Sequence, residues 1–141
     1  MALGVLLCLL VNCEETASQP EEEAPALSVP PATDRVTYDP AKGAHIVQPE
    51  MIKMLGDTLG IVMYESVLEP GDTAAWHEHP YHTVYVLEGG ALTVYFGNME
   101  PQLFELPQGV ALIQPPLGDM AINTGETPVR LLTHDIYSLD P

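Results

Sequence analysis

The sequence has very few basic residues. Its 141 residues include 4 Lys and Arg against 20 Asp and Glu, so the formal net charge is −16 at pH 7. A chain of this sign is repelled by phosphate backbones and by anionic membrane surfaces. The composition therefore argues against nucleic acid as a partner, and the length is that of a single domain with one site.

Cysteine and long apolar runs are scarce as well. The chain has 2 cysteines, and its apolar run Met1–Val11 is far shorter than the roughly 20 residues of a membrane-spanning helix. The run resembles the apolar middle of a secretory signal, and Cys13 follows it like the lipid-attachment cysteine of a bacterial lipoprotein. Residues 1–13 are therefore interpreted as a signal or lipoprotein-like segment with a lipid anchor at Cys13. Plain secretion and a cytosolic location are the alternatives. Loss of Cys8 with the signal would leave no cysteine pair, so the fold is not expected to depend on a disulfide.

Residues 14–34 have no aromatic side chain and are rich in acidic residues, proline and small residues. This composition predicts an extended, disordered linker. If Cys13 carries lipid, the linker would hold the following domain away from a membrane, and the location would be extracytoplasmic, as it would for a secreted protein. A disordered tail without a role is the alternative.

From residue 35 to residue 141, short apolar runs alternate with turns that contain glycine and proline. This pattern predicts one all-β domain, a sandwich or a barrel. Gly89-Gly90 and Gly97-Asn98 are predicted to be hairpin turns, and residues 50–55 are the one stretch with a possible helical turn. The predicted strands cover residues 45–48, 61–68, 74–79, 83–88, 91–96, 103–106, 110–114, 120–123 and 129–137.

Three of the 5 histidines fall within six residues, in the run from Trp76 to His82. His77 and His79 are two residues apart, so in a strand both side chains leave the same face and can converge on one ion. Pro80 cannot continue a ladder, so His82 would need a bend after His79 to return to that side. Neutral imidazole is the commonest transition-metal ligand, and the cluster predicts a divalent metal site for Zn, Fe, Mn, Ni or Cu. Taken alone, a pair of surface histidines is the alternative.

The remaining histidines and the single tryptophan are expected to be structural. Trp76 is predicted to be core or pocket wall. His134 is expected to fill or edge the barrel, and His45 to lie at the surface.

Two motifs resemble those of the cupin superfamily. Gly71-x5-His77-x-His79, followed by the segment that ends at Gly89, is similar to the first cupin motif. A weaker match to the second motif runs from Gly109 to residue 125. The resemblance covers roughly residues 55–137. It implies a cupin-type jelly-roll β-barrel with a metal inside the barrel mouth, and it favours a homodimer.

Two positions depart from the family pattern. The family's Glu ligand falls at His82, and the family's second-motif His, four residues before the Asn, falls at Asp119. Replacement of one ligand type by another is chemically reasonable, so Asp119 would complete a site of three histidines and one carboxylate. Alternatively, Asp119 only hydrogen-bonds within its own turn.

These features leave three functions open. The first is a small-molecule metalloenzyme, with oxidation, isomerisation and lyase chemistry undecided, because the sequence offers no obvious general base. The second is a non-catalytic extracytoplasmic module that binds a metal or a small ligand. The third is a cupin fold with an empty site that is kept for oligomer contacts.

Overall fold

The computed structural model describes residues 38–137, and strands dominate this range. Its helical elements are three short turns near the start: η1 (Pro40–Lys42), α1 (Ala44–Val47) and η2 (Pro49–Met51). The strands are β1 (Ile52–Thr58), β2 (Ile61–Leu68), β3 (Thr73–His79), β4 (Tyr81–Glu88), β5 (Gly90–Tyr95), β6 (Gln102–Leu106), β7 (Ala111–Gln114), β8 (Leu117–Asn123) and β9 (Val129–Ile136). Within residues 38–137, no helix is long and apolar enough to cross a membrane.

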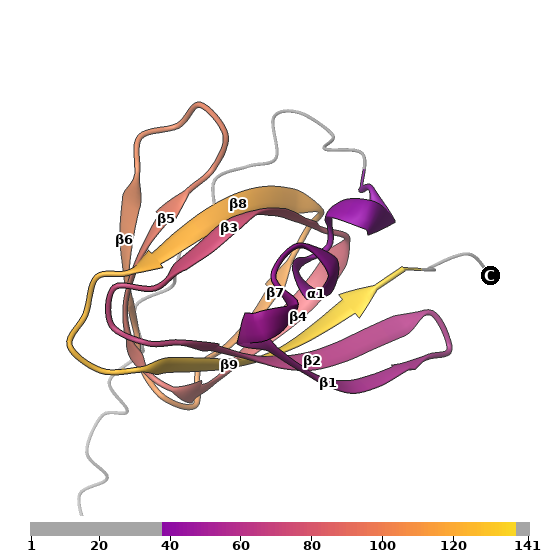
Figure 1. The fold of residues 1–141 in the computed structure, drawn as a ribbon, viewed down its shortest axis with the longest axis horizontal. Coiled ribbons are helices and arrows are strands. Elements are labelled where there is room, and N and C mark those ends of the chain that lie inside the picture. Colours follow the sequence, from indigo (N-terminus) through magenta and orange to yellow (C-terminus); the bar gives the residue numbers. More distant parts are fainter. Residues whose placement is uncertain (1–37, 138–141) are drawn as a thin grey trace, which may run out of the picture.

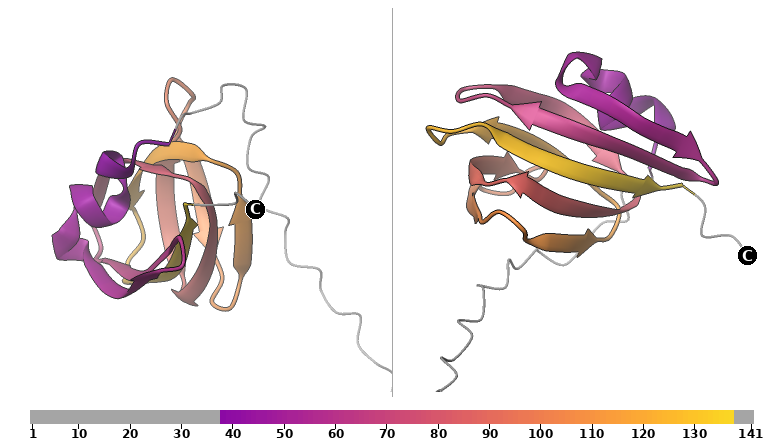
Figure 2. Two further views of the ribbon diagram at one scale, coloured as in Figure 1. Left: turned by 90° about the vertical axis from the view of Figure 1, so that its right-hand side faces the viewer. Right: turned by 90° about the horizontal axis from the view of Figure 1, so that it is seen from below.

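The strands form two antiparallel sheets that enclose a common interior (Figure 1). One sheet has five strands in the order β1-β2-β9-β4-β7, and the other has four in the order β3-β8-β5-β6. Figure 2 shows both sheets curving around this interior. Inward side chains of both sheets, such as Val86 and Leu92, belong to one buried apolar cluster. The arrangement confirms the predicted all-β, cupin-type jelly-roll barrel.

The start of the domain differs from the strand pattern predicted for it. Residues 45–48 were expected to be a strand, but Ala44–Val47 is the helix α1. Residues 50–55 were expected to contain a possible helical turn, and this is correct for Glu50 and Met51, which belong to the 3-10 turn η2, whereas the strand β1 begins at Ile52. Short apolar runs suit either element, and here tertiary contacts decide between them. The segments predicted at residues 1–13 and 14–34 lie outside the described residues.

One of the two predicted hairpin turns is wrong. Gly97-Asn98 lies between β5 and β6, which pair with each other, so this hairpin is confirmed. Gly89-Gly90 instead joins β4 of the five-stranded sheet to β5 of the four-stranded sheet. A Cβ at Gly89 would lie 2.2 Å from the carbonyl oxygen of Leu106. Glycine is therefore needed there for the close approach of two backbone segments, and no hairpin turn is involved.

A bulge in β3 decides which way its side chains point. The register against β8 shifts between Ala74 and His77, so these two residues, three apart, both face inward. Trp76 is consequently 43% exposed on the outer face, which corrects the prediction that it is core or pocket wall. Its ring packs against Gly118, where an added Cβ would lie 2.7 Å from Trp76 Cζ2.

The helical segment from η1 to η2 covers the gap between the edge strands β1 and β3 of the two sheets (Figures 1 and 2). Glu78, on the outward side of β3, is only 7% exposed because this segment lies over it. Its carboxylate accepts hydrogen bonds from the Asp39 backbone N–H at 3.0 Å and from Lys42 Nζ at 2.9 Å. These bonds fasten the start of the domain to the strand that carries the first two histidines of the cluster.

Candidate metal centre

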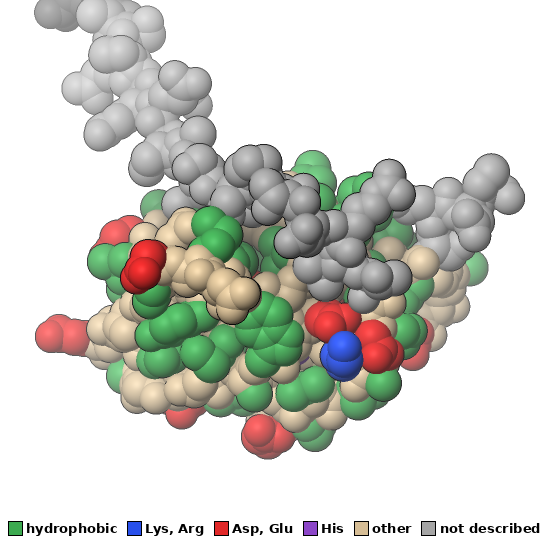
Figure 3. All heavy atoms as spheres, turned by 90° about the horizontal axis from the view of Figure 1, so that it is seen from above, with side chains coloured by type: hydrophobic (Ala, Val, Ile, Leu, Met, Phe, Trp, Pro, Cys, Tyr) green, Lys and Arg blue, Asp and Glu red, His purple; other side chains and the backbone are tan. Residues whose placement is uncertain are grey.

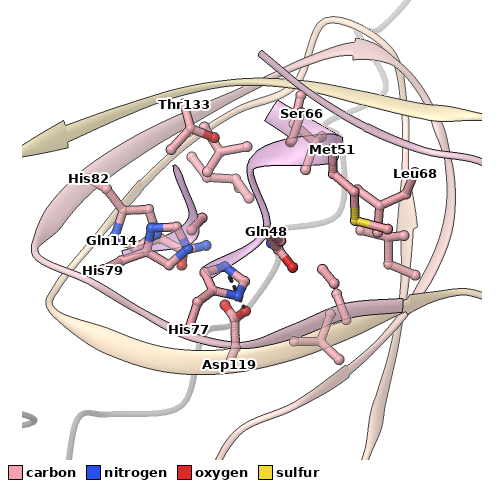
Figure 4. Close-up of a pocket in the computed structure, with 18 of the residues that line it drawn as sticks. Gln48, Met51, Ser66, Leu68, His77, His79, His82, Gln114, Asp119 and Thr133 are labelled. Carbon is pink, nitrogen blue, oxygen red and sulfur yellow. Dashed lines mark ion pairs between the residues drawn. The ribbon is translucent and has the colours of Figure 1, made fainter. Parts of the chain in front are cut away.

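His77, His79 and His82 come together inside the barrel, as the sequence predicts (Figure 4). Their side chains are buried. The ring centroid of His79 lies 4.6 Å from that of His77 and 4.3 Å from that of His82. His77 and His79 share the inward face of β3 by strand parity. β3 belongs to the four-stranded sheet, whereas β4, which carries His82, belongs to the five-stranded sheet. Both sheets therefore contribute histidines to the cluster.

Pro80 explains how His82 reaches the same place. It stands alone between the end of β3 and the start of β4, where the chain passes from the four-stranded to the five-stranded sheet. A residue that cannot donate to a ladder suits such a corner. Beyond the corner, His82 lies on the inward face of β4 and is 2% exposed. The bend that the sequence required after His79 is therefore present.

Each of the three imidazoles has its Nδ1 occupied by a hydrogen-bond acceptor. A carbonyl or carboxylate oxygen can only accept, so in the neutral form of each ring Nδ1 carries the proton and Nε2 keeps its lone pair. This arrangement is typical of metal-ligating histidines, whose second nitrogen donates to such a partner. The three bonds are His77 Nδ1 to Ala75 O at 2.7 Å, His79 Nδ1 to Asp135 Oδ1 at 2.9 Å, and His82 Nδ1 to Pro80 O at 2.9 Å.

Asp119 lies directly across the ladder from His77, because the two are register partners of β8 and β3. Its Oδ1 is 3.4 Å from His77 Nε2. Two ligand atoms bound to one ion at about 2.0–2.2 Å lie about 3.4 Å apart at a tetrahedral angle, so the spacing fits a shared ion. Asp119 lies inside the strand β8 and pairs with His77 across the ladder, so it does not belong to a turn. The alternative of a turn-forming aspartate is therefore wrong.

Asp135 was missed by the sequence analysis. It is 0% exposed, and it accepts hydrogen bonds from His79 Nδ1 at 2.9 Å and from Tyr64 Oη at 3.2 Å. Alternation along β9 could have found it, because Asp135 shares its inward face with Thr133 and Val129. A carboxylate on an inward face is rare without a partner, and here it is paired with an imidazole.

Two sets of potential ligands share His79. One is His77, His79 and Asp119, and the other is His79, His82 and Asp135. The carboxylate of Asp135 already accepts the Nδ1 proton of His79, so it orients this ring from behind. The donor set that faces the interior therefore consists of the three Nε2 atoms and the Asp119 carboxylate. We name these four residues, His77, His79, His82 and Asp119, the histidine end of the cavity.

Burial and charge move the pKa values of the rings in different directions. Burial lowers the pKa of His77, although Asp119 opposes this shift. Burial and the neighbouring His79 lower the pKa of His82 to about 4. Burial also disfavours the charged form of His79, but the hydrogen bond that His79 donates to Asp135 and the charges of Asp119 and Asp135 outweigh it and raise its pKa. Neutral rings at His77 and His82 are the form that binds metal.

The histidine end closes one side of a cavity of about 130 Å³. Figure 4 shows Met51 and Leu68 on the side away from the imidazoles. No Lys or Arg is among the described residues that line the cavity. We name the opposite side the apolar end; it consists of Met51, Leu68, Leu92, Phe96 and Phe104.

The other two histidines lie outside the cavity. His134 is half-buried on β9, and its Nδ1 is 3.0 Å from Thr83 Oγ1. His45 is half-buried as well, with Nε2 3.2 Å from Tyr137 Oη, so its predicted place at the surface is corrected.

Comparison with known proteins is informative at the level of structure. No protein-family profile matches the sequence. No curated protein matches it. A cupin domain from Bordetella pertussis superimposes with a TM-score of 0.57 at 20% identity, over 62% of this chain and 92% of that one. A double-stranded β-helix protein from Klebsiella pneumoniae gives 0.52 at 22% identity, over 64% and 78% of the two chains. An RmlC-like cupin from Methanocaldococcus jannaschii gives 0.51 at 18% identity, over 61% and 78%.

The chain therefore has the cupin fold, which confirms the resemblance found in its motifs. Inside this fold lie two overlapping groups of residues that could hold a metal ion: His77, His79 and Asp119, and His79, His82 and Asp135. Imidazole nitrogens combined with a carboxylate suit Zn, Fe, Mn, Ni and Cu alike.

Proposed function

We propose that this chain binds one divalent transition-metal ion and acts on a small molecule at that ion. The observation that carries the proposal is the set of three hydrogen bonds that Nδ1 of His77, His79 and His82 donates to oxygen atoms, because in neutral rings they leave the Nε2 lone pairs available to an ion. A single core histidine can donate in the same way, but here three such rings lie side by side and line one cavity. Their burial beside a fourth donor, Asp119, also argues against a cupin fold kept with an empty site.

The residues of the chain have separate roles in this proposal. His77, His79, His82 and Asp119 hold the ion, and Asp135 keeps the His79 ring in its orientation. Tyr64 in turn donates a hydrogen bond to Asp135. A bound ion would supply Lewis acidity or, as iron, manganese or copper, redox chemistry. The apolar end would exclude water from the reacting molecule.

The first experiment is metal analysis of the full chain purified without an affinity tag. We expect about one transition-metal ion per chain, and we expect its loss in the double variant His77→Ala with His79→Ala. The matched control is His45→Ala with His134→Ala, which removes two histidines away from the cavity and should retain the ion. A wild-type chain without stoichiometric metal, or equal loss in both double variants, would refute the site.

A second measurement distinguishes an enzyme from a non-catalytic binder. Four protein ligands leave a position open on a five- or six-coordinate ion, and an open position is the mark of a catalytic site. Azide binding to the Co²⁺-substituted protein, followed by its visible spectrum, reports such a position. A spectral change supports the enzyme. An unresponsive spectrum favours the alternative, a binding module outside the cytoplasm.

Location and oligomeric state remain proposals. The extracytoplasmic location depends on residues 1–34 and on lipid at Cys13, which mass spectrometry of the mature protein tests. The homodimer is suggested by the resemblance to cupins. Exposed apolar side chains such as Leu103 and Ile113 are compatible with it, and Figure 3 shows hydrophobic side chains gathered on one face. Light scattering of the purified chain measures the mass directly.

A further inference from the structure

Gln48 is a buried polar residue without an evident structural purpose. Its side chain is among the residues that line the cavity, and the residue is only 5% exposed. Within residues 38–137, its Oε1 has no hydrogen-bond partner. An unsatisfied buried acceptor costs about 1–3 kcal/mol, so its retention calls for a partner that residues 38–137 do not provide.

The surroundings of Gln48 hold it in this orientation. Its backbone N–H donates to Ala44 O at 3.0 Å, and its carbonyl accepts from Met51 N at 3.1 Å. The segment that carries it is fastened to β3 through Glu78, next to His77 and His79. Figure 4 shows the Gln48 side chain between His77 and Met51, pointing into the cavity. The free oxygen therefore lies where the histidine end meets the apolar end.

The cavity limits the size and charge of a partner for this oxygen. Its volume is about 130 Å³. A cavity of roughly 150 Å³ lined by apolar side chains is known to accept benzene, so the body of the ligand is about the size of one six-membered ring. With no Lys or Arg among its described lining residues, the cavity offers no side-chain partner for an anionic group.

We propose that the ligand is a small molecule with three features: an oxygen that reaches the ion, a neighbouring hydroxyl or N–H group that donates to Gln48 Oε1, and an uncharged, apolar body in the apolar end. The first feature rests on the proposed function, because it requires the metal. The second and third rest on Gln48 and on the cavity itself. Gln48 is thus a specificity-determining residue, supplied by the helical segment at the start of the domain.

Hydroxamic acids provide suitable probes, since they bind metals through oxygen and carry an adjacent N–H. We would measure the affinity of benzohydroxamic acid and of its N-methyl analogue for the Zn²⁺-loaded full chain by calorimetry. The N–H compound should bind about 5- to 10-fold more tightly, the value of one hydrogen bond to a buried acceptor. In Gln48→Met, which removes the acceptor at similar volume, this preference should vanish while the N-methyl compound keeps its affinity.

Controls distinguish the ligand contact from a structural role. Gln102→Met makes the same change at a residue that does not line the cavity, and it should keep the N–H preference. Gln48→Met should also be at least as resistant to heat as the wild type without a probe, because it loses an unsatisfied oxygen. A destabilised Gln48→Met would instead assign Gln48 to folding and overturn the inference.

The failures of the two proposals give different results. If the chain takes up zinc but binds both probes equally well, or prefers the N–H compound in Gln48→Met as well, the inference is wrong and the metal site stands. If the chain takes up no zinc and binds neither probe, both proposals fall.

Discussion

The histidine end and the apolar end of the cavity are built by the same rule and serve different purposes. Both consist mainly of inward side chains of the two sheets, selected by the alternation along each strand, and the apolar end adds Met51 from η2 and Phe96 from just beyond β5. At the apolar end, residues such as Leu92 belong to the buried core, and their burial stabilises the fold. At the histidine end, the inward positions carry polar groups whose desolvation is compensated by hydrogen bonds. The comparison implies that function and stability reside in neighbouring parts of one interior and can be altered separately.

The largest effect is expected from His77→Ala, at the histidine end. The variant loses a ligand, so stoichiometric metal should disappear and affinity should fall by more than the 10- to 100-fold typical of an outer partner. Heat denaturation of the metal-free protein should change little, since within residues 38–137 the ring donates one hydrogen bond, to a local carbonyl, and its other polar neighbour is Asp119 at 3.4 Å. Metal analysis and circular dichroism measure the two quantities. His134→Ala, outside the cavity, should match the wild type in metal content, and equal metal loss there would contradict the assignment.

The second-largest effect is expected from Leu92→Ala, at the apolar end, and it concerns stability. Leu92 is 4% exposed, and its truncation should lower the free energy of unfolding by about 2–5 kcal/mol. Urea denaturation in the presence of a chelator measures this loss without a contribution from the metal. Without chelator and at urea concentrations below the unfolding transition, the variant should still bind one ion per chain. Loss of the ion from folded Leu92→Ala would show that the two ends are coupled.

A smaller effect is expected from Asp135→Asn, which acts on the histidine end through His79. An amide oxygen can still accept the Nδ1 proton, so the geometry is kept while the charge is lost. We expect metal affinity to fall by about 10- to 100-fold with unchanged stoichiometry. Competition with a chromophoric chelator measures it. A loss of affinity that only follows a loss of folded protein would reduce Asp135 to a structural role.

The smallest effect is expected from Tyr64→Phe, one step further from the ion. Tyr64 donates to Asp135 at 3.2 Å, and its hydroxyl lies 3.5 Å from His79 Nδ1, the ring nitrogen that faces Asp135. Removal of its hydroxyl should weaken metal binding by less than 10-fold, measured with the same chelator. An effect larger than that of Asp135→Asn would reverse the order in which the two residues act.

Most of the fold could be predicted from the sequence, because alternation and turn residues are local signals. The strands from β2 to β9 lie close to their predicted positions, and the hairpin at Gly97 follows its turn residues. The strand predicted at residues 45–48 failed because a short apolar run does not reveal its period. The hairpin predicted at Gly89 was wrong because, in a sequence, a glycine needed for the close approach of two backbone segments cannot be told from a glycine in a hairpin turn.

The residues of the histidine end also divide into those that the sequence could predict and those that it could not. The pairing of His77 and His79 follows from a spacing of two in a strand, and that spacing is written in the sequence. The position of His82 depends on a corner between two sheets, and that of Asp119 on the register of β8 against β3. Asp135 and Gln48 carry no motif, and only their burial makes them conspicuous.

The sequence by itself therefore determined an all-β domain and a pair of histidines on one face of a strand, since both depend on neighbours along the chain, and its motifs resembled those of cupins. The tertiary structure alone decided that His82 and Asp119 meet that pair, that Asp135 orients His79, and that Gln48 points into the cavity an oxygen without a partner among residues 38–137. These relations join residues as far as 56 positions apart, and only the pairing of strands and sheets brings them into contact.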